Sequence, residues 1–183
     1  PYVYDAVLRK WLDAVVLVLT ARIEGVLSVC LRNCIRPPLV LREEFALPVP
    51  DQRPSCTLWE VPAGLLEEGD VGIAGIKNRA AAEALEETGY PIPADDFALL
   101  PGAPFLSPGV IPERIHFAHA AVADVHRRSN PTGDGSPVED GAIVKWFALG
   151  EALTMCERGV IADTKTELAL RRLADRERRG ENR

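Results

Sequence analysis

Three glutamates near the middle of the chain have a spacing suited to metal-dependent chemistry. An α-helix turns about 100° per residue, so Glu83, Glu86 and Glu87 fall within one arc about 100° wide. Carboxylates on one helical face repel one another, and acids at the C-terminal end of a helix also oppose its macrodipole. A divalent cation such as Mg²⁺ would remove both conflicts, because hard cations bind carboxylate oxygens. The pattern indicates a metal site, with a solvated acidic face as the structural alternative.

These carboxylates need a helix whose other side packs on a core. We expect that helix at residues 78–88, with Gly89 as its C-cap. Two glycines within residues 71–76 argue against an earlier start. A short strand at residues 58–61 is expected to precede the helix. The side opposite the carboxylates is expected to pack on the core and consists of Ala81, Ala84, Leu85 and Thr88.

The residues around the glutamates resemble the signature of the Nudix hydrolase family. That signature runs G, five residues, E, seven residues, then R-E-U-x-E-E-x-G-U, in which U is apolar. Gly64 opens it here, and residues 83–90 match its second half. The chain departs from the signature at Asp70, which replaces Glu, and at Ala82, which replaces Arg. Eleven residues, instead of seven, separate these two positions.

Four further segments resemble the ADP-ribose pyrophosphatase branch of this family. Residues 60–64 resemble its E-x-P-A-G segment, and residues 107–113 resemble its S-P-G-x-x-x-E segment. Arg36-Pro37-Pro38 resembles the end of its R-Q-Y-R-P-P segment. Residues 163–166 resemble the D-x-K-T that begins the final helix, with Asp163 as N-cap. The resemblance touches most of residues 13–173 and favours an ADP-ribose-like substrate.

The resemblance implies roles for individual residues. Mg²⁺, or Mn²⁺ in its place, would be bound by Glu83, Glu87 and the Ala63 carbonyl. Glu86, or Glu139 from an acidic loop before the last strand, would orient or deprotonate the attacking water. The residues expected to contact or shape the substrate site are Arg36, Gly64, Arg79, Pro108, Gly109 and Glu113.

Arg79 has a second expected role. The arginine of the family signature holds the metal-binding glutamates in place, and Ala82 stands at that position here. Arg79 lies one helical turn before Glu83 on the carboxylate face, so we expect it to replace that arginine.

The implied fold is α/β, a Nudix-type α/β/α sandwich with a mixed β-sheet between helices. The implied reaction is hydrolysis of a nucleoside diphosphate linked to another moiety, above all ADP-ribose, to a nucleoside monophosphate and a sugar phosphate. The altered signature leaves open a nucleotide-binding module that does not cleave. A structural domain with a vestigial site is a third alternative. Coenzyme A and dinucleoside polyphosphates rank lower as substrates, because the chain lacks the additional motifs associated with them.

Length and composition are those of one soluble globular domain over residues 1–183. Of the 183 residues, 47% are hydrophobic and 26% are charged, and the formal net charge is −6. This negative charge argues against nucleic acid or an anionic membrane as a partner. Neither a membrane-spanning apolar run nor a signal-peptide pattern is evident, so we expect a cytoplasmic protein with reduced cysteines.

The ends of the chain differ in character. The apolar residues within 1–12 have no core of their own, and N-terminal strands in the related branch contribute to a dimer, so a homodimer is expected. Residues 174–183 form a charged tail. Between the ends, periodicity predicts strands at residues 13–20, 26–32, 115–125 and 143–147 and helices at 150–158 and 163–173.

Two other sets of metal-ligating residue types have less suitable spacing. Cys30 and Cys34 form a C-x₃-C, but no second close pair follows, so a zinc site is not expected. His116 and His119 are three apart in a predicted strand and would point to opposite faces. The metal prediction therefore depends on the glutamates.

Overall fold

A computed structural model describes residues 3–51, 55–133 and 141–180 of the protein. Its centre is a mixed sheet of eight strands with the main order β3-β2-β1-β7-β5. The three long strands are β1 (Ala14–Ile23), β2 (Val26–Ile35) and β7 (Ile111–Ala121), and β1 runs parallel to β7. The shorter strands are β3 (Thr57–Glu60), β4 (Ala63–Leu65), β5 (Ala98–Leu99), β6 (Phe105–Ser107) and β8 (Ile143–Ala148).

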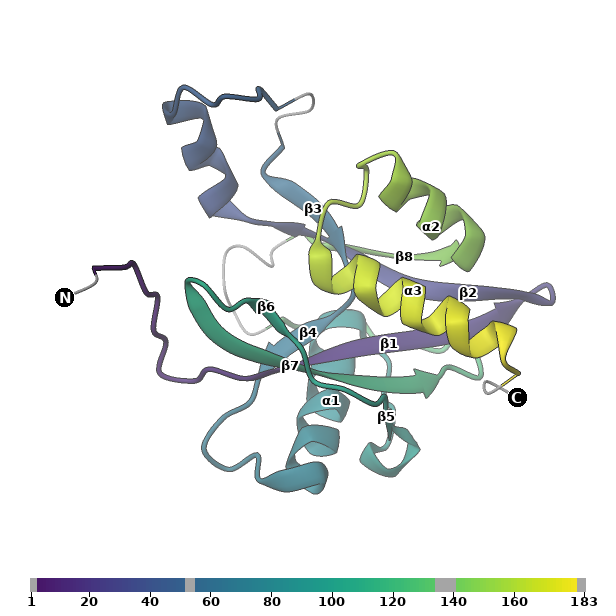
Figure 1. Ribbon diagram of the computed structural model, residues 1–183. Helices are drawn as coiled ribbons and strands as arrows, with labels where there is room; N and C mark the ends of the chain where they lie inside the picture. Colours follow the sequence, from purple (N-terminus) through teal and green to yellow (C-terminus); the bar gives the residue numbers. More distant parts are fainter. Residues whose placement is uncertain (1–2, 52–54, 134–140, 181–183) are drawn as a thin grey trace.

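Helices cover both faces of the sheet (Figure 1). Helix α1 (Gly72–Thr88) lies on one face, and α2 (Leu149–Glu157) and α3 (Thr164–Arg178) lie on the other. Strand β1 supplies both apolar cores, because alternate side chains of a strand point to opposite faces. Val16 and Val18 pack with residues of α2 and α3, whereas Leu17 and Leu19 pack with residues of α1. The predicted α/β/α sandwich is confirmed.

The strand predictions hold closely for the first hairpin and less closely for β7. Glu24 and Gly25 have φ values of 51° and 81° and form the two-residue turn between β1 and β2. Strand β7 begins at Ile111, four residues before the predicted 115–125, because its first residues pair with β6. It ends at Ala121, and the Asp124 side chain then accepts a hydrogen bond from the His126 amide in the following turn.

Helix α1 begins earlier than the sequence predicted. It starts at Gly72, not at residue 78, and ends before Gly89, which adopts the expected left-handed conformation with φ 78°. A Cβ at Gly75 would overlap the backbone of Asp70, so this glycine permits a tight approach between the helix and the preceding loop. The four additional residues amount to about one helical turn. The insertion lies within residues 71–81, and all of these except Val71 belong to α1.

The C-terminal helix is also longer than predicted. Asp163 caps α3 as expected by accepting the Thr166 amide at 2.9 Å. The helix continues to Arg178, so much of the predicted charged tail is helical. Glu177 there accepts a hydrogen bond from Arg22 of β1 at 2.6 Å, which fixes the last turn on the sheet.

The segment that follows β2 projects away from the sheet and is called the η1 arm (Figure 1). It begins with the 3-10 helix η1 (Pro37–Glu44), which has no buried residue. All four cysteines of the chain are free thiols. Within the described ranges, no helix is both long enough and apolar enough to cross a bilayer.

Candidate active site

Strand β4 brings Ala63 and Gly64 against the glutamates of α1. Antiparallel pairing with β1 fixes this short strand, with Val15 opposite Gly64. A Cβ at Gly64 would overlap the carboxylate of Glu83. Any larger residue would therefore occupy the place of that carboxylate. The expected substrate-contacting Gly64 has a definite steric role beside a predicted metal ligand.

Glu87 lies next to the same backbone but inside the protein. The Ala63 amide donates a hydrogen bond to its Oε2 at 2.9 Å, and Arg32 Nη1 donates to its Oε1. Glu87 is only 6% exposed, whereas Leu85 is 44% exposed. Leu85 was predicted to pack on the core, and it is exposed instead. Glu87, which was grouped with the other carboxylates, is buried, because its ion pair with Arg32 permits this position.

Arg79 lies on the carboxylate face, with its side chain 20% exposed. Its Nε donates to Asp70 Oδ2 at 2.9 Å, and its Nη2 is 3.2 Å from Glu67 Oε2. The distance from its Nη1 to Glu83 Oε1 is 3.9 Å. Arg79 thus contacts Asp70 more closely than Glu83, and its role as replacement for the arginine of the signature stays a prediction.

A cavity of about 320 Å³ opens beside β4. Four of the predicted site residues line it: Ala63, Gly64, Arg36 and Glu113. Arg36 directly follows β2 and Glu113 belongs to β7, so the fold gathers residues that are distant in sequence around one space. Pro108 and Gly109 form the turn between β6 and β7, but the cavity is lined by residues on the flanking strands instead.

Arg36 is held at this cavity by the buried Glu60. Its Nε and Nη2 donate to the two oxygens of Glu60 at 2.6 and 2.7 Å. Lys165, from the first turn of α3, also donates to Glu60 and lines the cavity. Burial alone would raise the pKa of Glu60, but hydrogen bonds and charge from Arg36 and Lys165 lower the pKa overall. The carboxylate is therefore ionised and fixes two cations at one wall.

The loop after β7 is anchored at the end of α1. The amides of Thr132 and Gly133 donate to the Glu86 carbonyl at 3.1 and 3.0 Å, and the Ser129 amide donates to the Gly89 carbonyl at 2.9 Å. These bonds satisfy carbonyls that a helix end leaves without partners. Glu139, the second predicted base, lies outside the described residues, while the Glu86 side chain is partly exposed beside this loop.

Sequence reasoning assigned no role to several charged residues at this site. Arg32 belongs to a strand of mostly apolar residues. A charged residue in such a strand must be paired if it is buried, and this is the signal that could have identified it. Lys165 was noticed only as part of a helix-start motif. Arg9 gave no signal at all, yet it lines the cavity and pairs with Glu113. Long-range pairs of this kind are visible only in the folded chain.

Known proteins match this chain over most of its length. The GDP-mannose pyrophosphatase of Cronobacter sakazakii is 34% identical over 150 residues, which cover 80% of this chain and 71% of that protein. The GDP-mannose pyrophosphatases of Pectobacterium atrosepticum and Escherichia coli are 33% and 32% identical, and the matches cover 69% and 70% of those proteins. The chain belongs to the Nudix hydrolase family. No family model matches the sequence.

Nudix hydrolases generally use divalent metals such as Mg²⁺, and carboxylate oxygens are the kind of donor that such an ion takes. The Glu83 carboxylate lies against Gly64, and the Glu87 carboxylate lies against the Ala63 amide, so two acids meet at adjacent backbone positions. Within the described ranges, no three His, Cys, Asp or Glu side chains cluster closely enough to hold a metal. Metal binding by Glu83 and Glu87 therefore stays a prediction.

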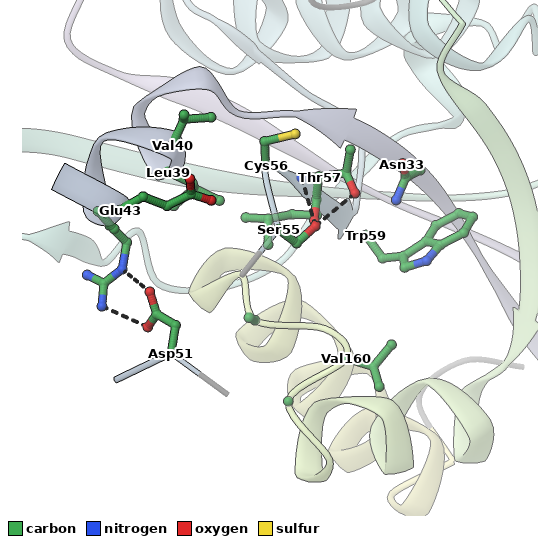
Figure 2. A pocket seen from close by; sticks show the side chains of 14 residues that line it. Asn33, Leu39, Val40, Glu43, Asp51, Ser55, Cys56, Thr57, Trp59 and Val160 are labelled. Atoms are coloured by element: carbon green, nitrogen blue, oxygen red, sulfur yellow. Dashed lines mark hydrogen bonds and ion pairs between the residues drawn. The ribbon is translucent and has the colours of Figure 1, made fainter. Parts of the chain in front are cut away.

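A second, larger cavity lies away from the predicted site residues. It has a volume of about 810 Å³ and lies between the η1 arm, β3 and the segment before α3. Figure 2 shows Trp59, Thr57 and Asn33 on one side and Val160 on another. An ion pair between Arg42 and Asp51 closes part of its rim, with Nε and Oδ2 2.8 Å apart. None of the predicted site residues lines this cavity.

Proposed function

We propose that the protein is a Mg²⁺-dependent pyrophosphohydrolase of a nucleoside diphosphate sugar. Water would attack one phosphorus of the diphosphate and the bridging P–O bond would break, giving a nucleoside monophosphate and a sugar phosphate. The observation that carries this proposal is the meeting of Glu83, Glu87 and the Ala63-Gly64 backbone beside the cavity that Arg36 lines. The family membership supports the same reaction class.

Each group has a distinct task in this proposal. Glu83 and Glu87, with the Ala63 carbonyl, would hold the metal, which would supply polarisation of the phosphoryl oxygens and a lower pKa for the attacking water. Arg36 binds the diphosphate, because its guanidinium is held in one orientation by Glu60. Glu86 orients or deprotonates the water, with Glu139 as the alternative. Catalysis of this kind depends on positioning and charge neutralisation, so no covalent nucleophile is needed.

Two substrates are the first candidates. GDP-mannose is supported by the relatives, which are GDP-mannose pyrophosphatases and match about four-fifths of this chain. ADP-ribose is supported by the resemblance of residues 107–113 and of Arg36-Pro37-Pro38 to the ADP-ribose pyrophosphatase branch. Both contain the same diphosphate, so they differ at the sugar and the base.

The test is an incubation of the purified protein with each substrate and Mg²⁺, followed by chromatography of the nucleotides. GMP from GDP-mannose or AMP from ADP-ribose is the expected product, and coenzyme A serves as the comparison substrate. The Glu83→Gln variant is the control for contaminating hydrolases. Binding of a substrate that then survives intact with Mg²⁺ and Mn²⁺ would favour the non-cleaving nucleotide-binding module. Neither binding nor cleavage would favour a domain with a vestigial site.

A further inference from the structure

The ion pair between Arg32 and Glu87 joins the sheet to helix α1 inside the protein. Arg32 lies on β2, opposite Glu60 of β3 and Val144 of β8. The two paired side chains are only 4% and 8% exposed. A buried charge is costly unless it is paired and hydrogen-bonded, so each partner determines where the other can lie.

Both oxygens of Glu87 have protein donors. Arg32 Nη1 donates to Oε1, and the Ala63 amide donates to Oε2 at 2.9 Å. A carboxylate has about four lone-pair sites, so two donors leave room for a metal at the same group. The donors come from β2 and β4, whereas Glu87 itself belongs to α1. Together they fix the plane of the carboxylate beside the Ala63 backbone.

On α1 itself, neither residue 82 nor Arg79 makes the same contact. Residue 82, directly before Glu83, is an alanine. Arg79 has its shortest ion-pair distance, 2.9 Å, to Asp70 in the preceding loop. Arg32 instead reaches Glu87 from the sheet, 55 residues away in the sequence.

We propose that Arg32 is a positioning residue for the metal site and performs the task that an arginine at residue 82 would perform. This inference rests on the proposed function, because it assumes that Glu87 is a metal ligand. Arg32 holds the Glu87 carboxylate in the orientation that presents its remaining lone pairs beside the Ala63 carbonyl. Groups that orient metal ligands in this way affect metal affinity without touching the metal.

Metal affinity separates this role from a merely structural one. A cation near a metal site repels the metal, so loss of Arg32 by charge alone would leave Mn²⁺ binding unchanged or strengthen it. Loss of the orienting hydrogen bond would weaken Mn²⁺ binding, by about ten- to hundredfold for groups of this kind. Only the positioning role therefore predicts a higher Kd for Mn²⁺ when Arg32 is replaced.

The experiment compares wild type with Arg32→Met and Arg32→Lys by titration with Mn²⁺, using the electron paramagnetic resonance signal of the free ion. We expect Arg32→Met to weaken Mn²⁺ binding about tenfold or more. Arg32→Lys retains the charge but lacks the planar fork, so it should recover part of that affinity. Arg22→Met is the matched control, because it removes another ion-paired arginine of the sheet at a distant, half-exposed position.

Melting temperatures without metal establish which variants fold. If Arg32→Met does not fold, Arg32→Lys decides the matter, and the proposal then requires weaker Mn²⁺ binding than in wild type. An unchanged or tighter Mn²⁺ affinity in the folded variants would overturn the role of Arg32 and leave the proposed function standing. Absence of Mn²⁺ binding in the wild-type protein would overturn both.

Discussion

Arg79 Nε donates to Asp70 Oδ2 at 2.9 Å, whereas its Nη1 lies 3.9 Å from Glu83 Oε1. The same Asp70 oxygen accepts the Glu67 amide at 2.8 Å. Arg79 therefore closes the loop between β4 and α1 while it borders a predicted metal ligand. Asp70, which replaces the first acid of the family signature, is engaged in holding this loop.

Substitution of Arg79 should affect both catalysis and stability. We expect Arg79→Ala to lower kcat at least tenfold, about 1.4 kcal/mol in the barrier, because small displacements of a positioned ligand are costly. Loss of the contact with Asp70 should also lower the melting temperature by about 2–4 °C, the equivalent of about 1 kcal/mol. Steady-state kinetics and thermal unfolding measure the two effects.

A second substitution tests the compensation. Ala82→Arg in the Arg79→Ala background places a cation directly before Glu83 and should restore part of kcat, but not the melting temperature, because Asp70 stays without Arg79. Unchanged kcat and metal affinity in Arg79→Ala alone would show that Arg79 serves only the loop.

The two acids at the ends of this region should differ in importance. Glu87→Gln removes a predicted metal ligand, whereas Asp70→Asn weakens a loop contact. We expect Glu87→Gln to lower kcat at least about tenfold more than Asp70→Asn does. Measurements at saturating Mg²⁺, on variants shown to be folded by circular dichroism, make the comparison. Equal losses of kcat would place the metal site elsewhere.

Gly64 offers a steric test of the same site. A Cβ at this position would overlap the Glu83 carboxylate, yet the backbone there has no positive φ that only glycine adopts easily. Gly64→Ala should therefore fold and displace Glu83, with weaker Mn²⁺ binding and lower kcat. Gly69→Ala, in the following loop, has open space around it and is the matched control. Equal Mn²⁺ affinity in both variants would mean that Glu83 does not bind the metal in this orientation.

Much of the fold could be predicted because local patterns determine it. The continuous apolar run in β1 predicts burial on both faces, and the two cores on either side of the sheet use alternate residues of that run. The start of α1 could not be predicted in the same way. Glycine in a helix costs about 1 kcal/mol, but Ile76 and Ala80 pack on the core and Gly75 fits against the Asp70 backbone. Tertiary contacts thus outweigh a local penalty.

The site, like the fold, combines features that local patterns predict with features that depend on tertiary contacts. Arg36, Gly64 and Glu113 each belong to a segment with a recognisable sequence pattern, and all three line one cavity. Their contact with substrate stays a prediction. Helical periodicity grouped Glu87 with Glu83 and Glu86, but it did not indicate that the Glu87 side chain is buried. Its buried position depends on Arg32, and no local pattern encodes a pair between residues 55 positions apart.

His119 predicts a pH dependence of stability. Burial, with Arg176 adding to the effect, lowers the pKa of His119 below its ordinary value of 6.5. The unfolded state therefore binds the proton more readily, and the free energy of unfolding rises with pH from the folded-state pKa up to about 6.5. We expect the melting temperature to fall between about pH 7 and about pH 5.

The matched variants are His119→Gln and His126→Gln. His119 Nε2 lies 2.9 Å from Thr20 Oγ1, a contact that glutamine can replace without titrating in this range. The exposed His126 is the control. Thermal unfolding over the pH series should give a flatter profile for His119→Gln alone. Identical profiles for the two variants would remove His119 as the cause.

The N-terminal segment predicts a homodimer. Its apolar side chains lie on the surface, with Val3 97%, Tyr4 78% and Leu8 73% exposed. The segment is nevertheless attached beside the cavity, because the Val7 amide donates to the Val110 carbonyl at 2.9 Å and Arg9 pairs with Glu113. Apolar surface of this kind marks an interaction site. We propose that a second copy of the chain covers it.

Light scattering after size-exclusion chromatography at micromolar concentration measures the oligomeric state. We expect twice the mass of the 20.0 kDa chain for the wild type. Leu8→Asp places a charge in the proposed interface and should shift the protein toward monomer, because an unpaired charge is costly to bury. Val26→Asp, at a half-exposed position in the β1–β2 hairpin, is the control and should remain dimeric. Since Arg9 lies at the cavity, dissociation should also raise KM for the nucleotide sugar. A monomeric mass for the wild-type protein would rule out the dimer.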